Sequence, residues 1–598
     1  MRVFAMIHTM LEVLSVRMPV VLSLCCLAVF PGWADEKPLF RVGFMTDTHV
    51  RRTKESCARV KGAFKVFRDL DCRAVVHCGD LADWHYEEGY KYYLEELESA
   101  FPPGMKDRPQ FLYVLANHDA LDPKRTDPKL RATRMMDLDI AFKDMVRRLK
   151  IDHWYFEQRE ICGYPILVFP QTVARSGGYG ELEKKVAETC ADHPGKPVFV
   201  CTHHAAKDTC YNSGSWGDAT LRKVLDKYPQ VVLFSGHTHG SLRNELSIWQ
   251  GGFTAVDVCC LQEWHGLSAG MPLRGKQSYG VIVAEVYPSR LVIRRFDVRD
   301  GSEMFPDRRW TVPLPFDPKT APFRIEERLR TSRPGVFAAD AKITCEPDAT
   351  PFGKVKVSFP AVKNEEDVGL YRVEIARRDG GGGWEKSAVC EIFSEFYKRP
   401  QDRTGILEGE VSCGFFDAGE TDYRFTVTPV GFFGTIGRGI STVFRVPAKK
   451  PSTVLWRCDN PMEELEFRCG WPKNADEMRK AKPVPKKDGW YVVEGRSWLS
   501  FKPGVWDLPK GARIRLVAEM SLDQVPILEG WNLYLKVNDS TERGLRGGWM
   551  STPSGKTESF RYVVETELAV PGLDYAITFT RGNGGRVRFK NVRLEKLD

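Results

Sequence analysis

The sequence predicts an α/β domain followed by two all-β domains. Between residues 40 and about 300, short apolar runs alternate with amphipathic segments of helical spacing, which is the pattern of layered α/β proteins. From about residue 325 this helical spacing disappears, and runs with period-two alternation follow one another between Gly- and Asp-rich turns. Proline-containing stretches at residues 312–322 and 447–453 mark the linkers between the three regions.

Length and composition agree with this division. The chain of 598 residues is too long for one hydrophobic core, and about 150 residues per domain suggests three or four domains. Its 42% hydrophobic and 28% charged residues are typical of a soluble globular protein and argue against a disordered chain or a membrane bundle. The net charge of +8 is spread along the chain, so no nucleic-acid-binding surface is evident. The cysteines show no zinc-binding spacing, and we assign them no chemistry.

The N-terminus has the features of a secretory signal. Arg17 precedes the apolar run at residues 20–30, and the small residues Gly32 and Ala34 follow it. We therefore expect residues 1–34 to be a signal peptide and the protein to be exported to the periplasm, the cell surface or the extracellular space. The run is too short for a comfortable transmembrane helix, and no second long apolar run follows, so we expect no transmembrane segment in the mature chain. Met18 is an alternative start.

The strands and helices of the first domain can be placed in order. Five apolar runs predict strands at residues 41–45, 74–78, 111–116, 198–202 and 231–235. Segments with helical spacing separate them, at residues 55–70, 87–100, 179–193 and 218–228. Two further strand-like runs, at residues 279–286 and 290–298, would close the domain.

The two later domains are predicted from strand patterns. Residues 323–447 end in a strand that places Tyr423, Phe425 and Val427 on one face, and this region resembles a fibronectin type III β-sandwich. Residues 453–598 look like a jelly-roll module of the carbohydrate-binding type, through which a glycan or cell-surface polymer could bind. Its tryptophans could stack on sugars, although aromatic residues in a β-sandwich are more often core. They are Trp490, Trp498, Trp506, Trp531 and Trp549.

Each of the five strands of the first domain is followed by residues that can bind metal ions. In chain order these are Asp47 and His49, Asp80, Asn117 and His118, His203 and His204, and His237 and His239. Ligands of an open α/β sheet bind beyond the carboxyl ends of its strands, so we expect these side chains to converge. Oxygen and imidazole ligands without thiolates suit manganese, iron or zinc. Because there are more ligands than one ion needs, we expect two divalent ions, with an aspartate bridging them through both oxygens.

These motifs point to a known family. D-x-H, GD, N-H-[DE], H and G-H-x-H, in this order and each after a strand, resemble the motifs of the calcineurin-like metallophosphoesterases. The resemblance implies that residues 38–311 form a four-layer α/β/β/α sandwich with a dinuclear metal site. It implies that one metal is bound by Asp47, His49 and His239, that the other is bound by Asn117, His203 and His237, that Asp80 bridges them, and that His118 is the acid beside the site.

The mechanism that the resemblance implies is direct hydrolysis of a phosphoester. A hydroxide bridging the two ions would attack phosphorus, and His118 would protonate the leaving oxygen. No G-x-S-x-G elbow, P-loop or H-E-x-x-H motif offers another chemistry. Two positions depart from the family. Ala116 replaces a usual glycine and could strain the turn, although every ligand type is kept. Asp83 occupies the position of a tyrosine in purple acid phosphatases, which argues against a purple ferric site.

Substrate contacts are less readable than metal ligands. His204 follows a predicted ligand and either faces the substrate or has a structural role. Residues 207–218 form a loop of the kind that covers an active site, with Asn212 or Trp216 as possible substrate contacts. Residues 83–90 either line the pocket or simply begin a helix.

The sequence favours an exported dinuclear-metal phosphoesterase that hydrolyses phosphodiesters or phosphomonoesters. The loops that would contact the substrate contain no motif that identifies it. A nucleotidase or cyclic-nucleotide phosphodiesterase is therefore a variant of this hypothesis. An alternative of another class is a surface or glycan-binding protein whose metal site is structural or weakly active. Ala116 is the one feature that favours this alternative.

Overall fold

A computed structural model of the chain describes residues 36–597 with gaps. The gaps are residues 51–53, 83–86, 121–148, 150–155, 171–176, 212, 262–278, 348–354, 379–380, 412–420, 447–451, 460–464, 467–483, 487, 495–497, 524–530, 538–539, 547–559, 569–570 and 582–585. The predicted signal peptide, Asp83 and Asn212 therefore lie outside the described residues, as does the side chain of Asn117. Among the described residues, no helix is long and apolar enough to cross a membrane.

The first domain contains two mixed sheets. The first has the order β12-β11-β10-β1-β2-β3, with β13 also paired to β11. Its strands are β1 (Phe40–Met45), β2 (Ala74–His77), β3 (Gln110–Tyr113), β10 (Gly280–Val286), β11 (Arg290–Asp297), β12 (Ser302–Met304) and β13 (Trp310–Pro313). The strands β1, β2 and β3 are parallel. The two strands expected to close the domain, β10 and β11, continue the sheet and pair antiparallel.

The second sheet has the order β4-β5-β6-β7-β9-β8. Its strands are β4 (Glu157–Ile161), β5 (Tyr164–Val168), β6 (Val198–Cys201), β7 (Val231–Ser235), β8 (Ile248–Gln250) and β9 (Thr254–Asp257). The helices of the domain include α1 (Lys54–Asp69), α2 (Glu87–Ala100), α3 (Asn117–Ala120), α7 (Tyr179–Asp192), α8 (Ser213–Trp216) and α9 (Ala219–Leu225). Each predicted helix of this region is present within two or three residues of its expected bounds.

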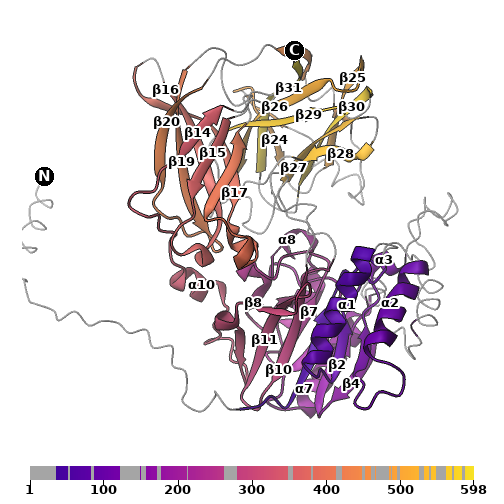
Figure 1. The fold of residues 1–598 in the computed structure, drawn as a ribbon. Coiled ribbons are helices and arrows are strands. Elements are labelled where there is room, and N and C mark those ends of the chain that lie inside the picture. The colour runs from indigo at the N-terminus through magenta and orange to yellow at the C-terminus, as the bar shows by residue number, and fades with distance from the viewer. Residues whose placement is uncertain are drawn as a thin grey trace, which may run out of the picture. The chain divides into compact units, whose positions relative to one another are not determined.

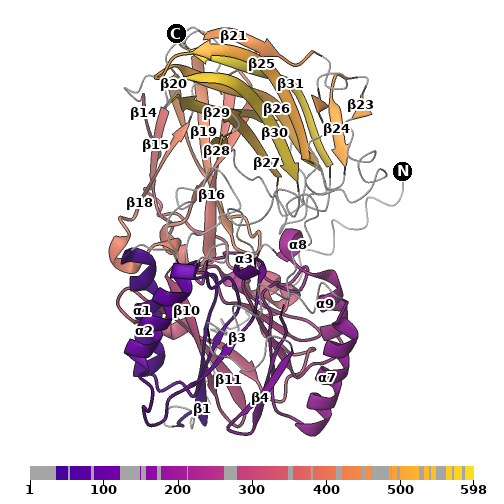
Figure 2. The ribbon, with the colours of Figure 1, turned by 90° about the vertical axis from the view of Figure 1, so that its right-hand side faces the viewer.

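The two sheets pack face to face, and helices cover their outer faces. Phe44 of the first sheet stacks on Phe234 of the second, with ring centroids 3.8 Å apart, inside a core shared by both sheets. Phe64 of α1 lies in a separate core with residues of α2, and Leu182 of α7 lies in another with residues of α9. Figure 2 shows α1 and α2 on one side of the strands and α7 and α9 on the other. This arrangement confirms the predicted α/β/β/α sandwich.

The parallel strands align the loops that carry the predicted ligands. Met45 at the end of β1 lies beside His77 at the end of β2, which lies beside Tyr113 at the end of β3. In the second sheet, Cys201 at the end of β6 lies beside Phe234 near the end of β7. The loops that follow these five strands consequently emerge at one edge of the sandwich (Figure 1).

The following domain contains two antiparallel sheets, as predicted. One consists of β14 (Thr344–Pro347), β15 (Val355–Pro360) and β18 (Ile406–Val411), and the other of β16 (Val368–Arg378), β17 (Trp384–Phe393), β19 (Thr421–Gly431) and β20 (Ile440–Val446). Tyr423, Phe425 and Val427 are fully buried together in its core, on the face that their spacing indicated. The finer fibronectin type III resemblance stays a prediction.

One helix in this part of the chain was not expected. Helix α10 (Ile325–Thr331) follows the proline-rich linker, and its two turns are too short to leave a clear periodic pattern. Its Ile325 packs against the core beneath α7 and α9, and its Arg328 donates a hydrogen bond to Glu245 over 3.2 Å. The helix is therefore anchored to the first domain.

The C-terminal domain is also built from two antiparallel sheets. One contains β21 (Ser452–Arg457), β23 (Val484–Pro485), β24 (Tyr491–Glu494), β26 (Arg513–Asp523), β29 (Phe560–Glu567) and β31 (Arg586–Leu597), and the other contains β22 (Leu465–Glu466), β25 (Trp498–Leu508), β27 (Trp531–Val537), β28 (Ser540–Arg546) and β30 (Gly572–Arg581). The predicted succession of an α/β domain and all-β domains is confirmed. Trp490 is buried and Trp506 is half-buried, whereas the side chains of the other three predicted tryptophans lie outside the described residues.

Candidate metal centre

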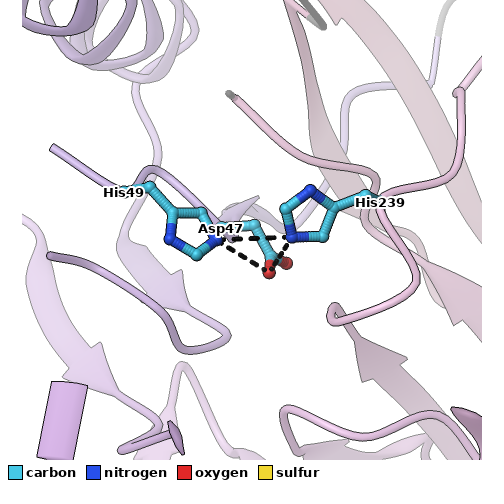
Figure 3. A group of neighbouring side chains, drawn as sticks. All are labelled: Asp47, His49 and His239. Carbon is cyan, nitrogen blue, oxygen red and sulfur yellow. Dashed lines mark hydrogen bonds and ion pairs between the residues drawn. The ribbon is translucent and has the colours of Figure 1, made fainter. Parts of the chain in front are cut away.

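Asp47, His49 and His239 bring three ligand atoms together at the edge of the sandwich (Figure 3). The Oδ1 atom of Asp47 lies 3.0 Å from Nε2 of His239 and 3.6 Å from Nε2 of His49, and the two Nε2 atoms lie 3.3 Å apart. Oxygen and nitrogen ligands about 2.0–2.2 Å from a shared ion lie about 3 Å from one another, so these atoms fit around a single ion.

Hydrogen bonds orient the Asp47 carboxylate. Its Oδ2 accepts hydrogen bonds from the Thr46 hydroxyl over 2.7 Å and the backbone N–H of His237 over 2.9 Å. Its Oδ1 is buried and accepts no hydrogen bond from any residue that the structure describes. A buried carboxylate oxygen without a donor is costly, and a cation among the three ligand atoms would compensate it.

A second group contains Asp80, His203 and His237. The Oδ2 atom of Asp80 lies 3.1 Å from Nε2 of His203, and that Nε2 lies 3.1 Å from Nδ1 of His237. The Nδ1 atom of His203 lies 2.9 Å from the carbonyl oxygen of Cys78. If Nδ1 carries the proton and donates it there, the lone pair of Nε2 is directed into the group.

Asp80 connects the two groups. The same Oδ2 that faces His203 lies 3.8 Å from Nε2 of His49, and Asp80 forms a third group of potential ligands with His49 and His118. The Oδ1 atom instead accepts a hydrogen bond from the backbone N–H of His118 over 3.0 Å. The structure therefore places one carboxylate oxygen, rather than both, between the two groups.

The other predicted site residues are also near this edge where they can be described. The ring of half-buried His118 lies 4.7 Å from that of His49, edge to face. The rings of His204 and Trp216 lie 4.2 Å and 5.5 Å from that of His237. Asn117 is the first residue of α3, directly before His118.

The charges of the two groups are interdependent. Burial alone would raise the pKa of Asp47 and of Asp80, but the facing imidazoles, chiefly His239 for Asp47 and His203 for Asp80, lower both pKa values below their ordinary range. Burial would likewise lower the pKa of His203, yet Asp80 and Asp47 raise it to about 9. Burial and the neighbouring His204 and His203 lower the pKa of His237. In the metal-free protein, protonated His203 thus supplies positive charge to the aspartates.

The backbone of the ligands is strained. Five of the predicted ligands adopt left-handed backbone conformations, with φ of 47° at Asp47, 39° at His49, 53° at Asp80, 69° at His237 and 47° at His239. This region is uncommon for residues other than glycine, and each instance costs about 1–3 kcal/mol. Such strain gathers at functional sites, where the surrounding structure holds the side chains in place.

Glycines flank the G-H-x-H motif because its loop closely approaches other segments of the same chain. A Cβ atom at Gly236 would lie 2.0 Å from the hydroxyl of Thr46 and 2.4 Å from Oδ2 of Asp47. A Cβ atom at Gly240 would lie 2.4 Å from Oδ2 of Asp257. Any side chain at either position would push the two histidines away from their partners.

The expected strain at Ala116 is not found. Ala116 is buried and does not adopt a positive φ, so its methyl group needs no unusual backbone conformation. The close approach is instead accommodated by Gly79, where a Cβ atom would lie 2.7 Å from that of Ala116 and 2.6 Å from Nδ1 of His203. The substitution is therefore compatible with the loop geometry.

Sequence reasoning missed a buried histidine beneath the site. The N–H of Gly79 donates to Nδ1 of His77 over 3.2 Å, so Nε2 of a neutral His77 carries the proton and faces the hydroxyl of Thr48 at 3.0 Å. Burial lowers the pKa of His77 to about 3, which keeps the ring neutral. The Thr48 hydroxyl then donates to the carbonyl of Leu81 over 2.7 Å. This chain of hydrogen bonds ties the D-x-H loop to the G-D loop.

Two buried aspartates hold the other loops. Asp119 accepts hydrogen bonds from four backbone N–H groups, those of Asp80, Leu81, Ala82 and Ala116, and from the hydroxyl of Tyr90. Asp257 accepts one from the hydroxyl of Thr238, between the two histidines of G-H-x-H, over 2.6 Å. Position in the N-H-D motif could have drawn attention to Asp119, whereas no sequence signal marks Asp257.

The α/β/β/α fold and the gathered carboxylate and imidazole groups are those of a domain able to hold metal ions, and comparison with known proteins agrees. Residues 40–241 match the model of the family described as calcineurin-like phosphoesterase. This part of the chain is therefore a calcineurin-like phosphoesterase domain. No curated protein matches the chain.

Several solved structures are similar to parts of the chain. A dimetal phosphatase from Danio rerio is 11% identical, with a TM-score of 0.33, over 46% of this chain and 99% of its own. A xylan-binding domain from Paenibacillus barcinonensis is 8% identical, with a TM-score of 0.18, over 25% of this chain and 99% of its own. A mannan-recognising carbohydrate-binding module is 15% identical, with a TM-score of 0.18, over 25% of this chain and 99% of its own.

Proposed function

We propose that this protein is a dinuclear-metal phosphoesterase that hydrolyses phosphodiesters or phosphomonoesters. The observation that carries the proposal is the position of Asp80 Oδ2 between two groups of buried ligands, 3.1 Å from His203 and 3.8 Å from His49. A site of oxygen and imidazole ligands suits manganese, iron or zinc. Asp47, His49 and His239 would hold one ion, Asn117, His203 and His237 the other, and Asp80 would contact both.

Residues of the chain would hold the ions, donate a proton and keep the ligands in position. Divalent ions held here would lower the pKa of water towards about 7 and neutralise charge on the phosphate oxygens. His118 is half-buried beside His49 and Asp80, and its imidazole would donate a proton to the leaving oxygen. The strained loops would keep the ligands in position without rearrangement during the reaction.

The test is metal analysis combined with paired assays on p-nitrophenyl phosphate and bis-p-nitrophenyl phosphate. Wild-type protein should bind two ions and hydrolyse at least one of these esters. The substitution Asp80→Asn keeps the shape of the side chain and removes its charge, and we expect hydrolysis to fall by about 10³-fold or more, comparable to the loss of a major electrostatic group.

A matched control is Asp107→Asn. Asp107 also has a left-handed backbone, with φ of 60°, but it is exposed and pairs with Arg73 over 3.1 Å, away from the ligands. Its activity should equal that of the wild type. Two bound ions without turnover of any phosphoester would contradict the proposed enzyme and favour a binding protein with a structural metal site. Ala116 does not adopt a positive φ, so backbone strain at this position gives that alternative no support.

We further propose that the protein is exported and that residues 453–598 bind a glycan or cell-surface polymer. The apolar run at residues 20–30 supports export, and the jelly-roll resemblance of the C-terminal domain supports glycan binding. Binding of the full chain to a glycan array and fractionation of producing cells would test the two parts separately. If the chain binds no glycan on the array, the C-terminal domain would have a structural role only.

A further inference from the structure

We infer that Trp216 forms a wall of the substrate site and stacks on a flat ring carried by the leaving group of the phosphoester. This inference rests on the proposed function, because it assigns a substrate class to the same metal centre. It is drawn from the exposure of Trp216, its contact with a predicted metal ligand and the way its loop is held.

Trp216 lies beside the ligands but is open to solvent. Its side chain is 39% exposed, and it is the only aromatic residue among the exposed large hydrophobic residues of the described parts of the chain. Its ring centroid lies 5.5 Å from that of His237, which belongs to the group around Asp80. The ring of His204 lies 4.2 Å from the same imidazole. A phosphoester bound at the ligands would therefore meet aromatic surface next to its phosphate.

The loop that carries Trp216 is closed at its base. Between β6 and α9, the N–H of Lys207 donates to the carbonyl of Asp218 over 3.0 Å, and the N–H of Asp218 donates to that of Ala205 over 2.8 Å. The side chain of Asp218 then caps α9 by accepting from two of its backbone N–H groups. Both ends of the loop are thus fixed to regular structure.

Inside the loop, buried Ser213 fixes the single turn of α8. Its hydroxyl accepts from the N–H of Thr209 over 2.8 Å and donates to the carbonyl of Cys210 over 2.6 Å, and its own carbonyl accepts from the N–H of Gly217 over 2.7 Å. Figure 2 shows α8 at the same end of the domain as α3, the helix that carries His118. The turn that carries Trp216 is therefore held by hydrogen bonds within its own loop, beside His237.

The chemistry of this surface indicates the substrate class. An indole offers a broad flat face with little polarity, and it binds rings by stacking rather than by hydrogen bonds. Such a face accepts an aromatic base, an aryl group or the apolar face of a pyranose, and a ring-free alcohol gains little from it. Because a phosphate has no ring, a ring stacked on Trp216 beside His237 would belong to the group that the phosphate esterifies.

The experiment compares three phosphoesters of primary alcohols, which share the bond to be broken. They are adenosine 5′-monophosphate with an aromatic ring, glucose 6-phosphate with a pyranose, and glycerol 3-phosphate with no ring. Methyl diesters of the same compounds replace them if the wild-type protein cleaves only diesters. The full chain loaded with manganese would be assayed as wild type, Trp216→Ala and Trp216→Phe, with Leu329→Ala as the control for an exposed apolar residue on α10.

The expected result is selective. Trp216→Ala should raise KM about tenfold for the ester whose ring stacks, with kcat and metal content nearly unchanged, and Trp216→Phe should restore most of the loss. KM for glycerol 3-phosphate should change less than about twofold, which is within the weak effect expected for a ring-free alcohol. A rise confined to the adenosine ester identifies an aromatic ring, and a rise for the glucose ester identifies a pyranose.

Two results would overturn the inference. If Trp216→Ala lowers turnover of all three esters alike and reduces the metal content, Trp216 only supports His237. If no KM changes, the ring does not contact substrate. Absence of hydrolysis by the wild type with two bound ions is a different result, because it contradicts the proposed function and this inference with it.

Discussion

Two buried charged clusters of the catalytic domain are balanced in different ways. In the first, the carboxylate of Glu245 accepts hydrogen bonds from Arg295 over 3.1 Å and from Arg328 over 3.2 Å. In the second, the carboxylates of Asp47 and Asp80 face imidazoles, and one oxygen of Asp47 accepts no hydrogen bond from a described residue.

The difference shows which cluster has its carboxylate charge balanced by permanent charges of the chain itself. A guanidinium is always charged, so the two arginines outweigh the burial that would raise the pKa of Glu245 and lower it to about 2. An imidazole is cationic only when protonated, so it cannot supply a permanent counter-charge. Leaving a buried charge uncompensated costs about 3–5 kcal/mol. The Glu245 cluster is therefore an anchor for α10. The aspartates face imidazoles, whose charge is lost on deprotonation, and are therefore suited to bound cations.

The largest effect should come from removing a ligand of the second cluster. His239 contacts Asp47 and His49 but is not in the group around Asp80, so His239→Ala should release one ion and retain the other. The affinity of the lost ion should fall by more than the about 100-fold typical of an outer-shell partner. Metal content after dialysis, measured by mass spectrometry, gives the ratio.

The control for this experiment is His193→Ala. His193 follows α7 and precedes β6, whereas the predicted ligand His203 follows the other end of β6. The Nδ1 atom of His193 lies 3.0 Å from the carbonyl oxygen of Thr189. It should keep both ions. Equal loss of both ions in His239→Ala would mean that the two groups do not correspond to separate ions.

A smaller effect is expected when the first cluster is neutralised. The folded pKa of Glu245 is lowered from 4.5 to about 2, so its contribution to stability is present above pH 4.5 and lost as the pH falls towards 2. This contribution is about 3 kcal/mol. Glu245→Gln should lower the melting temperature at pH 7 and flatten its decline between pH 5 and pH 3.

The relevant transition is the one that added manganese shifts, because it reports the catalytic domain. Glu327→Gln is the matched control, since Glu327 is on the same helix, partly exposed, and pairs with Arg330. If the slope of melting temperature against pH is unchanged in Glu245→Gln, ionisation of this carboxylate beside the arginines does not contribute to stability.

The smallest effect should come from removing a hydroxyl group that supports the predicted ligands. Thr238→Val preserves shape and removes the 2.6 Å hydrogen bond to Asp257, which fixes the loop between His237 and His239. We expect metal affinity to fall about 10-fold, the lower end for an outer-shell partner, with both ions still bound at saturation. Titration of the metal-free protein measures this, and Thr331→Val on α10 serves as control. Unchanged affinity would show that the backbone from His237 to His239 keeps its conformation without the hydrogen bond to Asp257.

The prediction from sequence succeeded where the information is local. Apolar runs and helical spacing located β1, α1, β2, α2, β6 and β7, and the polar residues directly after five strands marked the predicted ligands. Helix α10 was missed because seven residues do not establish a period. The position of a single Asp80 oxygen between the two groups of potential ligands was also not expected, because the hydrogen bond from His118 N–H to the other oxygen forms only in the folded loop.

The sequence by itself determined the order of elements, the chemical types of the ligands and their places at strand ends, because each depends on neighbouring residues in the chain. Only the tertiary structure decided that His77, Asp119 and Asp257 support the ligand loops and that Trp216 lies beside His237. It also shows the two histidines of G-H-x-H in separate groups of potential ligands. These outcomes depend on which strands pair and on how two sheets stack, and residues 190 positions apart meet there, as His49 and His239 do.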